Sequence, residues 1–194
     1  MNSVLMRLLA AVTVAFAAMG ASAQALEVEG VKLEPTTQVG GAALVLNGAG
    51  VRTRAIFKVY VAALYVPAKA SNAAALLAQK GPRRVAITML RNVDADTFSG
   101  ALSEGLQKNL SEAQFTGFKT QIDTLGANFK AAGEAKKGDV IHLEFAPDTG
   151  TRVVINGKPS GAAIPGEEFY TALLRIWLGD KPVDGDLKKG LVGG

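Results

Sequence analysis

The sequence has no cysteine and a single histidine among its 194 residues. Without cysteine, the chain can form no disulfide, no cysteine metal site and no thiol nucleophile, so its stability must come from packing. A conventional zinc site is not expected either, because His142 is the only imidazole. The sequence therefore predicts neither a metal nor another cofactor.

The sequence also lacks any strong clustering of charge. Its formal net charge is only +4, and the basic residues are spread among aspartates and glutamates. A nucleic-acid binder would gather its lysines and arginines on one face. We therefore expect no nucleic acid among its partners.

Residues typical of acid-base catalysis are scarce. His142 falls on the opposite parity from Ile141 and Leu143 in an alternating segment, which is typical of a histidine on the outer face of a strand. Glu167 and Glu168 begin a predicted helix, where carboxylates are favoured by the helix dipole. Their position at the start of a helix explains these two carboxylates better than a catalytic role does.

The one long apolar run stands at the N-terminus. Arg7 is the only charge before it, residues 8–19 are apolar, and the small residues 21–23 follow. The run is short for a membrane span, which needs about 20 apolar residues. Residues 1–23 are therefore predicted to be a cleaved signal peptide rather than an uncleaved anchor, and the protein to be periplasmic or secreted.

Cleavage can follow either Ala23 or Ala25. The first site leaves residues 24–194, a length typical of one domain with its own core. No second candidate for a membrane span follows, so we expect no stable span after cleavage.

Alternating apolar and polar residues predict most of the strands. Residues 26–33 read as a short hairpin or a bent edge strand. Residues 43–46 predict a strand, the glycine-rich residues 47–50 a turn, and residues 51–66 a long strand. Four further strands are predicted at 83–91, 140–145, 151–155 and from the Asn156-Gly157 turn to residue 164.

Helices are predicted where the apolar period changes to three and four residues. Ser71 is expected to cap a short helix at 72–79, Asp94 or Asp96 a helix through Leu110, and Ser111 a helix through Phe129. Residues 167–178 predict a helix and 187–191 a short terminal turn. Strands adjoin as hairpins and helices cluster, which indicates an α+β fold with helices on one face of an antiparallel sheet.

An unusual basic segment interrupts the long strand. On strict alternation Arg52, Arg54, Lys58 and Tyr60 share one face. That face is either the solvated side of the sheet or the wall of a cleft with cationic and phenolic donors. Such a cleft would suit an anionic, otherwise apolar ligand, because arginine binds carboxylates through a fixed fork of donors.

In this segment the chain resembles the chalcone isomerase family, specifically its bacterial chalcone isomerase-like branch. The matching sequence segments are GAGVR at 48–52, FKVYVAALY at 57–65, EF at 168–169 with IWLGD at 176–180, and DLK at 186–188. Their order and spacing hold from about residue 41 to 191. The resemblance implies an open-faced sandwich, a large antiparallel sheet covered on one face by helices, with the ligand cleft between them.

The resemblance also implies a comparison with the plant enzymes, which add a phenolate to an enone within one molecule. The arginine that assists them matches Arg52. Their threonine, tyrosine, asparagine and a further polar position correspond to Tyr60, Phe98, Gly105 and Ile176. The lost groups are donors aimed at developing charge, which commonly contribute about 100-fold or more to rate. These departures speak against chalcone isomerase activity.

Plastid relatives in the same superfamily bind fatty acids without catalysis, using an arginine and a tyrosine for the carboxylate. By that resemblance Arg52 and Tyr60 would form the anion site and Phe98 an apolar wall, although the four-residue stripe that contains Phe98 is typical of any packed helix. The leading hypothesis is thus a non-catalytic binder of a small amphipathic organic acid such as a fatty acid. An isomerase of unknown substrate that uses Arg52 as electrophile is the alternative, and a ligand-free interaction module is the third.

Overall fold

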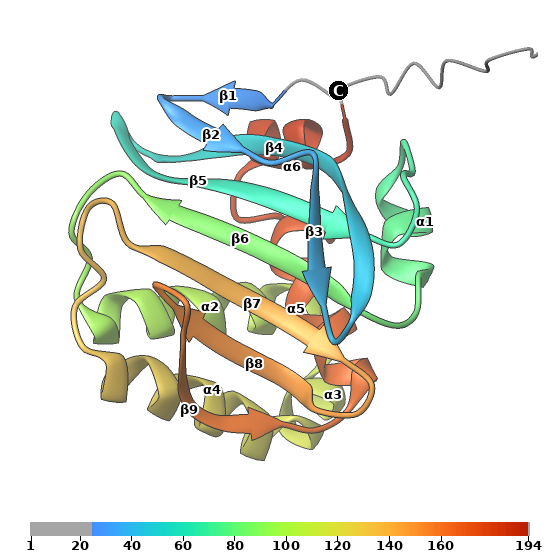
Figure 1. Ribbon diagram of the computed structural model, residues 1–194. Coiled ribbons are helices and arrows are strands. Elements are labelled where there is room, and N and C mark those ends of the chain that lie inside the picture. The colour runs from blue at the N-terminus through green and yellow to red at the C-terminus, as the bar shows by residue number, and fades with distance from the viewer. Residues whose placement is uncertain (1–24, 194) are drawn as a thin grey trace, which may run out of the picture.

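The computed structural model describes residues 25–193, so the predicted signal peptide 1–23 lies outside the described residues. Seven strands form one antiparallel sheet in which each strand pairs with its neighbour in the sequence (Figure 1). They are β3 (Thr36–Val39), β4 (Ala42–Arg54), β5 (Phe57–Val66), β6 (Arg83–Met89), β7 (Val140–Ala146), β8 (Gly150–Ile155) and β9 (Lys158–Ile164). A separate hairpin of β1 (Leu26–Val28) and β2 (Val31–Leu33) confirms the hairpin predicted there.

The helices cover one face of this sheet, as predicted for an α+β open-faced sandwich. Helices α2, α4 and α5 lie behind the sheet in Figure 1, and α6 lies behind β4. The helices are α1 (Ala73–Ala78), α2 (Ala95–Asn109), α3 (Glu112–Gly117), α4 (Lys119–Ala132), α5 (Glu167–Leu178) and α6 (Gly185–Leu191).

The alternation within the strands places a core on each face of the sheet. The larger core lies between sheet and helices, where Ile141 and Leu143 of β7 meet Phe169 and Trp177 of α5. A smaller core on the other face includes Leu33 of β2 and buried residues of β4 and β5.

Two helix boundaries differ from the sequence prediction. Asn72, not Ser71, caps α1, and its side-chain oxygen accepts from the N–H of Ala75 at 2.8 Å. The helix predicted from Ser111 to Phe129 is divided at Phe118 into α3 and α4. Ser111 does form the expected cap, in a reciprocal capping box with Gln114.

The turn predicted at residues 47–50 is wrong. Strand β4 continues through these residues, and the chain reverses at Ala55 and Ile56, which lie between the paired Arg54 and Phe57. The glycines of this stretch serve close packing rather than a turn. The actual turn carries no turn residue, and Ala55 adopts a positive φ of 54° there.

Helix α6 packs directly on the backbone of β4. A Cβ at Gly48 would lie 2.2 Å from the carbonyl oxygen of Gly190, and a Cβ at Gly190 would lie 2.4 Å from that of Ala49. Buried Asn47 joins the same elements, because its side-chain nitrogen donates to the carbonyl of Leu191 at 2.7 Å. Only glycine allows the helix to approach so closely.

The buried Arg83 explains the acidic start of α5. Its side chain has no exposed area and forms a 2.8 Å ion pair with Glu167, which also accepts from the N–H of Gly81 at 2.8 Å. The guanidinium lies over the rings of Phe145 and Tyr170, at 5.7 and 5.3 Å from their centroids. Glu167 is therefore a structural partner of a buried cation.

We predict that Gly48→Ala destabilises the protein by about 1–3 kcal/mol or more, because its Cβ meets rigid backbone. The matched control is Gly185→Ala at the start of α6, where a Cβ has nothing within 4 Å. Chemical denaturation of both variants tests this. Equal stability of the two would contradict the packing described for α6.

Candidate functional site

A β-bulge determines which side chains of the basic segment come together. Arg52 pairs with Tyr60 and Thr53 with Lys58, so Val59 is the extra residue on β5. Val59 and Tyr60 both pack against the core on the helix side. Lys58 turns to the other face, where it forms a 2.7 Å ion pair with Glu29. The prediction of a single shared face therefore holds for Arg52 and Tyr60 and is wrong for Lys58.

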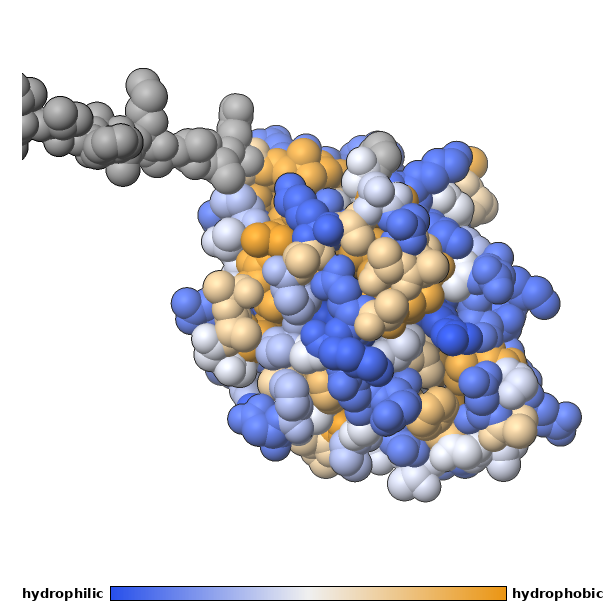
Figure 2. Space-filling model, turned by 90° about the vertical axis from the view of Figure 1, so that its right-hand side faces the viewer, coloured by the Kyte–Doolittle hydropathy of each residue, from blue (hydrophilic) through white to orange (hydrophobic). Residues whose placement is uncertain are grey.

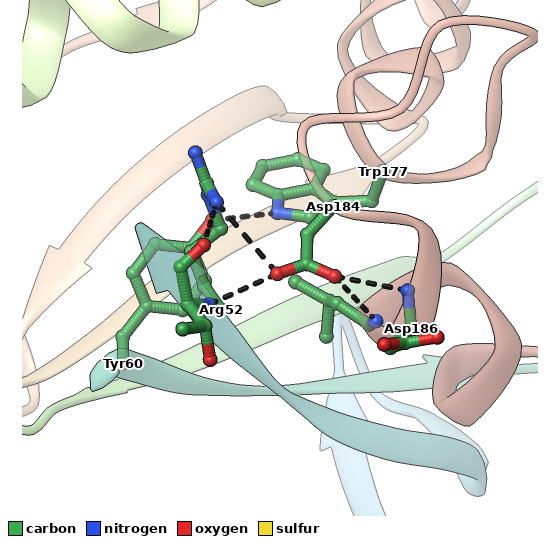
Figure 3. Close-up of polar contacts among 7 residues, drawn as sticks. Arg52, Tyr60, Trp177, Asp184 and Asp186 are labelled. Atoms are coloured by element: carbon green, nitrogen blue, oxygen red, sulfur yellow. Dashed lines mark hydrogen bonds and ion pairs between the residues drawn. The ribbon is translucent and has the colours of Figure 1, made fainter. Parts of the chain in front are cut away.

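Tyr60 is buried under the helical layer. Its side chain is 8% exposed, and its hydroxyl oxygen accepts a 3.0 Å hydrogen bond from Nε1 of Trp177 (Figure 3). Burial raises the pKa of Tyr60 to about 12, although the Trp177 hydrogen bond and the charge of Arg52 act to lower it. Tyr60 thus remains a protonated phenol across the physiological pH range.

Arg52 lies beside Tyr60 and faces Asp184. Its Nη1 is 3.6 Å from Oδ2 of Asp184, and the same nitrogen donates to the carbonyl of Thr53. The two side chains are only 18% and 14% exposed. The ion pair is therefore partly shielded from solvent, where an electrostatic interaction is stronger than on an open surface.

Asp184 is held by the start of α6 as well as by Arg52. Its Oδ1 accepts from the N–H groups of Asp186 and Leu187 at 2.9 and 3.0 Å, and its Oδ2 from that of Thr53 at 3.0 Å (Figure 3). Burial would raise the pKa of Asp184, but these hydrogen bonds and the charge of Arg52 outweigh it and lower the pKa. The carboxylate is thus ionised and fixed in place.

Phe98, the third predicted site residue, is part of the packed interior. It is 6% exposed, belongs to the same core as Tyr60, and its ring centroid lies 4.9 Å from that of Phe129. Two other positions compared with the plant enzymes meet directly, because a Cβ at Gly105 would lie 2.9 Å from Cγ2 of Ile176. An apolar contact thus joins α2 and α5 where the resemblance would place polar groups.

Two surface hollows lie away from these residues. One of about 490 Å³ lies between α2 and α4, with Leu106 and Leu125 among its lining residues. The other, of about 210 Å³, lies beside α5 and includes Phe118. Neither hollow is lined by Arg52, Tyr60 or Phe98.

His142 lies on the face of the sheet opposite the helices, as its parity predicted. It pairs across the strands with Ala86 and Val154, whereas Ile141 and Leu143 face the main core. Burial lowers its pKa, and the nearby charge of Arg84 adds to the effect. This imidazole is thus separated from Arg52 and Tyr60 by the sheet.

Sequence reasoning missed Trp177 and Asp184 as partners in the site. Trp177 is the only tryptophan, and a buried indole N–H needs an acceptor, which was a usable signal. Asp184 stands directly before the Gly-Asp-Leu start of α6, a typical N-cap position. Their contacts with Tyr60 and Arg52 are tertiary, so no local sequence pattern predicts them.

Among residues 25–193, no helix is long and apolar enough to cross a membrane. Within the same residues, no three side chains of the metal-binding types gather into a group that could hold an ion.

We predict that Tyr60 contributes to alkaline unfolding. Because its folded pKa of about 12 exceeds the ordinary value of 10.0, its contribution is complete below pH 10 and is lost as pH rises through 12. Tyr60→Phe should therefore lose less stability than the wild type between pH 9 and 12. At pH 7 it should be about 1–3 kcal/mol less stable, because Trp177 Nε1 is left without an acceptor.

Denaturant unfolding at several pH values provides this measurement. Lysines titrate in the same range in both proteins, so the difference between them isolates Tyr60. Parallel stability curves from pH 9 to 12 would rule out the raised pKa.

Comparisons with known proteins agree with this architecture. A search of curated proteins finds no match. Among solved structures, a fatty-acid binding protein of Arabidopsis thaliana aligns with a TM-score of 0.66 and 12% identity, covering 87% of this chain and 96% of that one. At this identity the likeness concerns the fold. The sequence family described as chalcone isomerase-like matches residues 25–193. The chain therefore belongs to the chalcone isomerase-like family.

Proposed function

We propose that this protein is exported and binds a small amphipathic organic acid, such as a fatty acid, without catalysis. Arg52 anchors the carboxylate and Tyr60 supplies a second donor. The observation that carries the proposal is the adjacent pair of Arg52 and Tyr60 on the helix-covered side of the sheet. The structural likeness to a protein that binds fatty acids supports the same ligand class.

The hydrogen-bonding chemistry around Tyr60 favours an anion. An indole N–H can only donate, so the hydroxyl oxygen of Tyr60 is the acceptor and its own proton remains available. Within residues 25–193, that proton meets no acceptor. The guanidinium of Arg52 adds donors in a planar fork. A carboxylate could accept from both residues at once.

Asp184 is the internal carboxylate that such a ligand would replace. It faces Arg52 at 3.6 Å, longer than a direct charge-assisted hydrogen bond. Three backbone N–H groups remain to hold Asp184 if Arg52 turns to a ligand. Exchange of one carboxylate for another at Arg52 would keep the guanidinium paired, while Asp184 would lose its ion pair but keep its three backbone hydrogen bonds.

The apolar part of the ligand would contact the aromatic side chains around Tyr60. Trp177 and Phe98 belong to the same core, which would give Phe98 the wall position expected from the sequence. Tyr60, Phe98 and Trp177 belong to one packed core, and neither of the two hollows described above borders Arg52, so an acyl chain held there would displace packed side chains. We therefore expect binding to require local movement of the helical layer.

The absence of a group that titrates near neutrality, within the described site, favours binding over the alternative isomerase. Tyr60 has a pKa of about 12, and His142 lies across the sheet. Proton transfer at neutral pH works best with a group whose pKa is close to the ambient pH. Arg52 alone could polarise a substrate but could not remove a proton from it.

We predict that an organic acid co-purifies with the protein from the periplasm and is lost in Arg52→Ala. Native mass spectrometry with lipid extraction identifies the acid, and recovery from the periplasm tests export. Arg152→Ala is the matched control, because Arg152 is an exposed arginine on β8 of the same sheet. Equal lipid content in Arg52→Ala and Arg152→Ala, or no lipid in any of the three proteins, would refute the anchoring role.

We further predict that Asp184→Asn binds a fatty acid at least severalfold more tightly than the wild type. Asparagine keeps a side-chain oxygen for the N–H groups of Asp186 and Leu187 but removes the charge that competes for Arg52. Displacement of a fluorescent fatty acid measures the affinity. Unchanged or weaker binding by a folded Asp184→Asn would show that Asp184 and the ligand do not compete.

A further inference from the structure

The hairpin between β4 and β5 ends in two exposed apolar residues. Ile56 is 86% exposed and Phe57 is 53% exposed, and with Leu26 they are the large hydrophobic side chains most open to solvent among residues 25–193. This tip lies at the left end of the sheet in Figure 1. Packing within the described domain covers little of Ile56 and only part of Phe57.

The turn at the tip is built from residue types that rarely occupy such turns. Ala55 has a φ of 54°, a region that asparagine or glycine occupies with less strain. A two-residue hairpin turn usually carries glycine, asparagine or aspartate. Here the turn residues are Ala55 and Ile56, so the conformational preferences of the turn do not explain why these two residues stand there.

Cations surround these apolar side chains. The guanidinium of Arg91 lies 4.5 Å from the ring centroid of Phe57. Arg54 and Lys58 flank the turn, and Asn92, next to Arg91, accepts from the N–H of Lys137 at 2.9 Å, which brings the loop before β7 to the same end. We call this surface the basic tip. It consists of Arg54, Ile56, Phe57, Lys58, Arg91, Lys136 and Lys137.

The carboxylates near the basic tip are mostly engaged inside the protein. Glu29 pairs with Lys58, and Asp94 caps α2. Asp139 accepts from the N–H of Lys136 and from Asn156. Glu134, in the loop after α4, has no ion pair among residues 25–193. In the same range Arg54, Arg91, Lys136 and Lys137 also have none. The five cations of the basic tip outnumber these four carboxylates by one, so the tip keeps a small excess of positive charge.

Figure 2 shows the opposite end of the sheet, from the side that carries α1 and β3, where hydrophilic side chains run across the face between apolar areas. Apolar side chains at a projecting tip, ringed by unpaired cations, have the composition of segments that enter the boundary between lipid headgroups and acyl chains. Anionic headgroups complement the surrounding cations.

We propose that the basic tip docks on the surface of an anionic lipid bilayer, with Ile56 and Phe57 inserted among the headgroups and Arg54 and Arg91 on lipid phosphates. The partner is thus a membrane surface, not a span through it. This inference goes beyond the proposed function and does not depend on it, because Arg52 and the interior take no part in the contact.

Sedimentation with lipid vesicles tests the proposal on the chain from residue 24, which contains the whole core. Vesicles of phosphatidylglycerol and phosphatidylethanolamine should bind it, and vesicles of phosphatidylcholine should bind it much less. Ile56→Ser should reduce the partition coefficient by about tenfold, because nearly all of this side chain is exposed before docking. Arg91→Ala should reduce it by about fivefold.

The controls are matched by exposure and charge. Leu26→Ser removes another exposed apolar side chain, and Lys69→Ala removes a cation at the far end of β5. Both should bind like the wild type, and thermal unfolding confirms that each variant is folded. Binding should also weaken as salt rises from about 0.05 to 0.5 M.

Three results would overturn the proposal. One is equal binding to anionic and neutral vesicles, or to neither. Another is an equal loss of vesicle binding in the Leu26→Ser and Ile56→Ser variants. The third is sedimentation velocity that shows a wild-type dimer dissociated by Ile56→Ser, which would make a second copy of the chain the occupant of the tip.

Discussion

The close contact between helix α6 and strand β4 is the constraint on which the candidate site depends. Gly48, Gly50 and Gly190 have no Cβ, so the helix backbone rests on the strand backbone. This contact fixes the start of α6, and Asp184 caps that start while it faces Arg52. Any residue larger than glycine at the contact would push α6 outward and separate the ion pair. The glycine-rich segment at residues 47–50 therefore sets the geometry of the ion pair between Arg52 and Asp184 and does not form a turn.

The site that results is rich in donors and poor in acceptors. Arg52 and Trp177 donate, the proton of Tyr60 meets no acceptor within residues 25–193, and Asp184 is the ionised acceptor that faces Arg52. A buried or half-buried cation must keep an anionic partner, because an unpaired charge there costs several kcal/mol. Under the proposed function, an organic acid that binds at Arg52 would replace one carboxylate by another. Three backbone N–H groups hold Asp184 independently of Arg52, which makes that replacement physically reasonable.

The sequence predicted the layers of the fold because they follow from periodicity, which is a local property. Ile141, Leu143 and Phe145 alternate, and Phe169, Leu173 and Trp177 recur at helical spacing, so strand and helix were both recognised. The hairpin turn at Ala55 and Ile56 was missed because its residues are apolar and its strain is compensated by sheet pairing. The face of Lys58 was also wrong, because the two-residue turn pairs Arg54 with Phe57 and so reverses the parity of β5 relative to β4. The bulge at Val59 reverses the parity a second time, so the shared face predicted for Arg52 and Tyr60 holds because the two offsets cancel. Their partners Asp184 and Trp177 come from segments more than a hundred residues away, beyond the reach of any local pattern.

The proposed anion site and the basic tip belong to one hairpin, but solvent screens the charges of the two sites to different degrees. Arg52 and Tyr60 pair across β4 and β5 just inside the bulge, under the helices, whereas Arg54 and Phe57 pair at the exposed end. Solvent ions screen charges at the exposed end within about 10 Å at 0.1 M salt, but they screen a half-buried pair much less. Ionic strength should therefore separate the two properties, since it weakens attraction to a lipid surface while leaving the exchange of carboxylates at Arg52 largely unaffected. Because both proposed sites lie on β4 and β5, the sheet would hold the anion site at a fixed, short distance from a docked membrane. An amphipathic acid leaving that membrane would then meet Arg52 without crossing bulk solvent for long, and burial of its apolar part under the helices would favour the transfer.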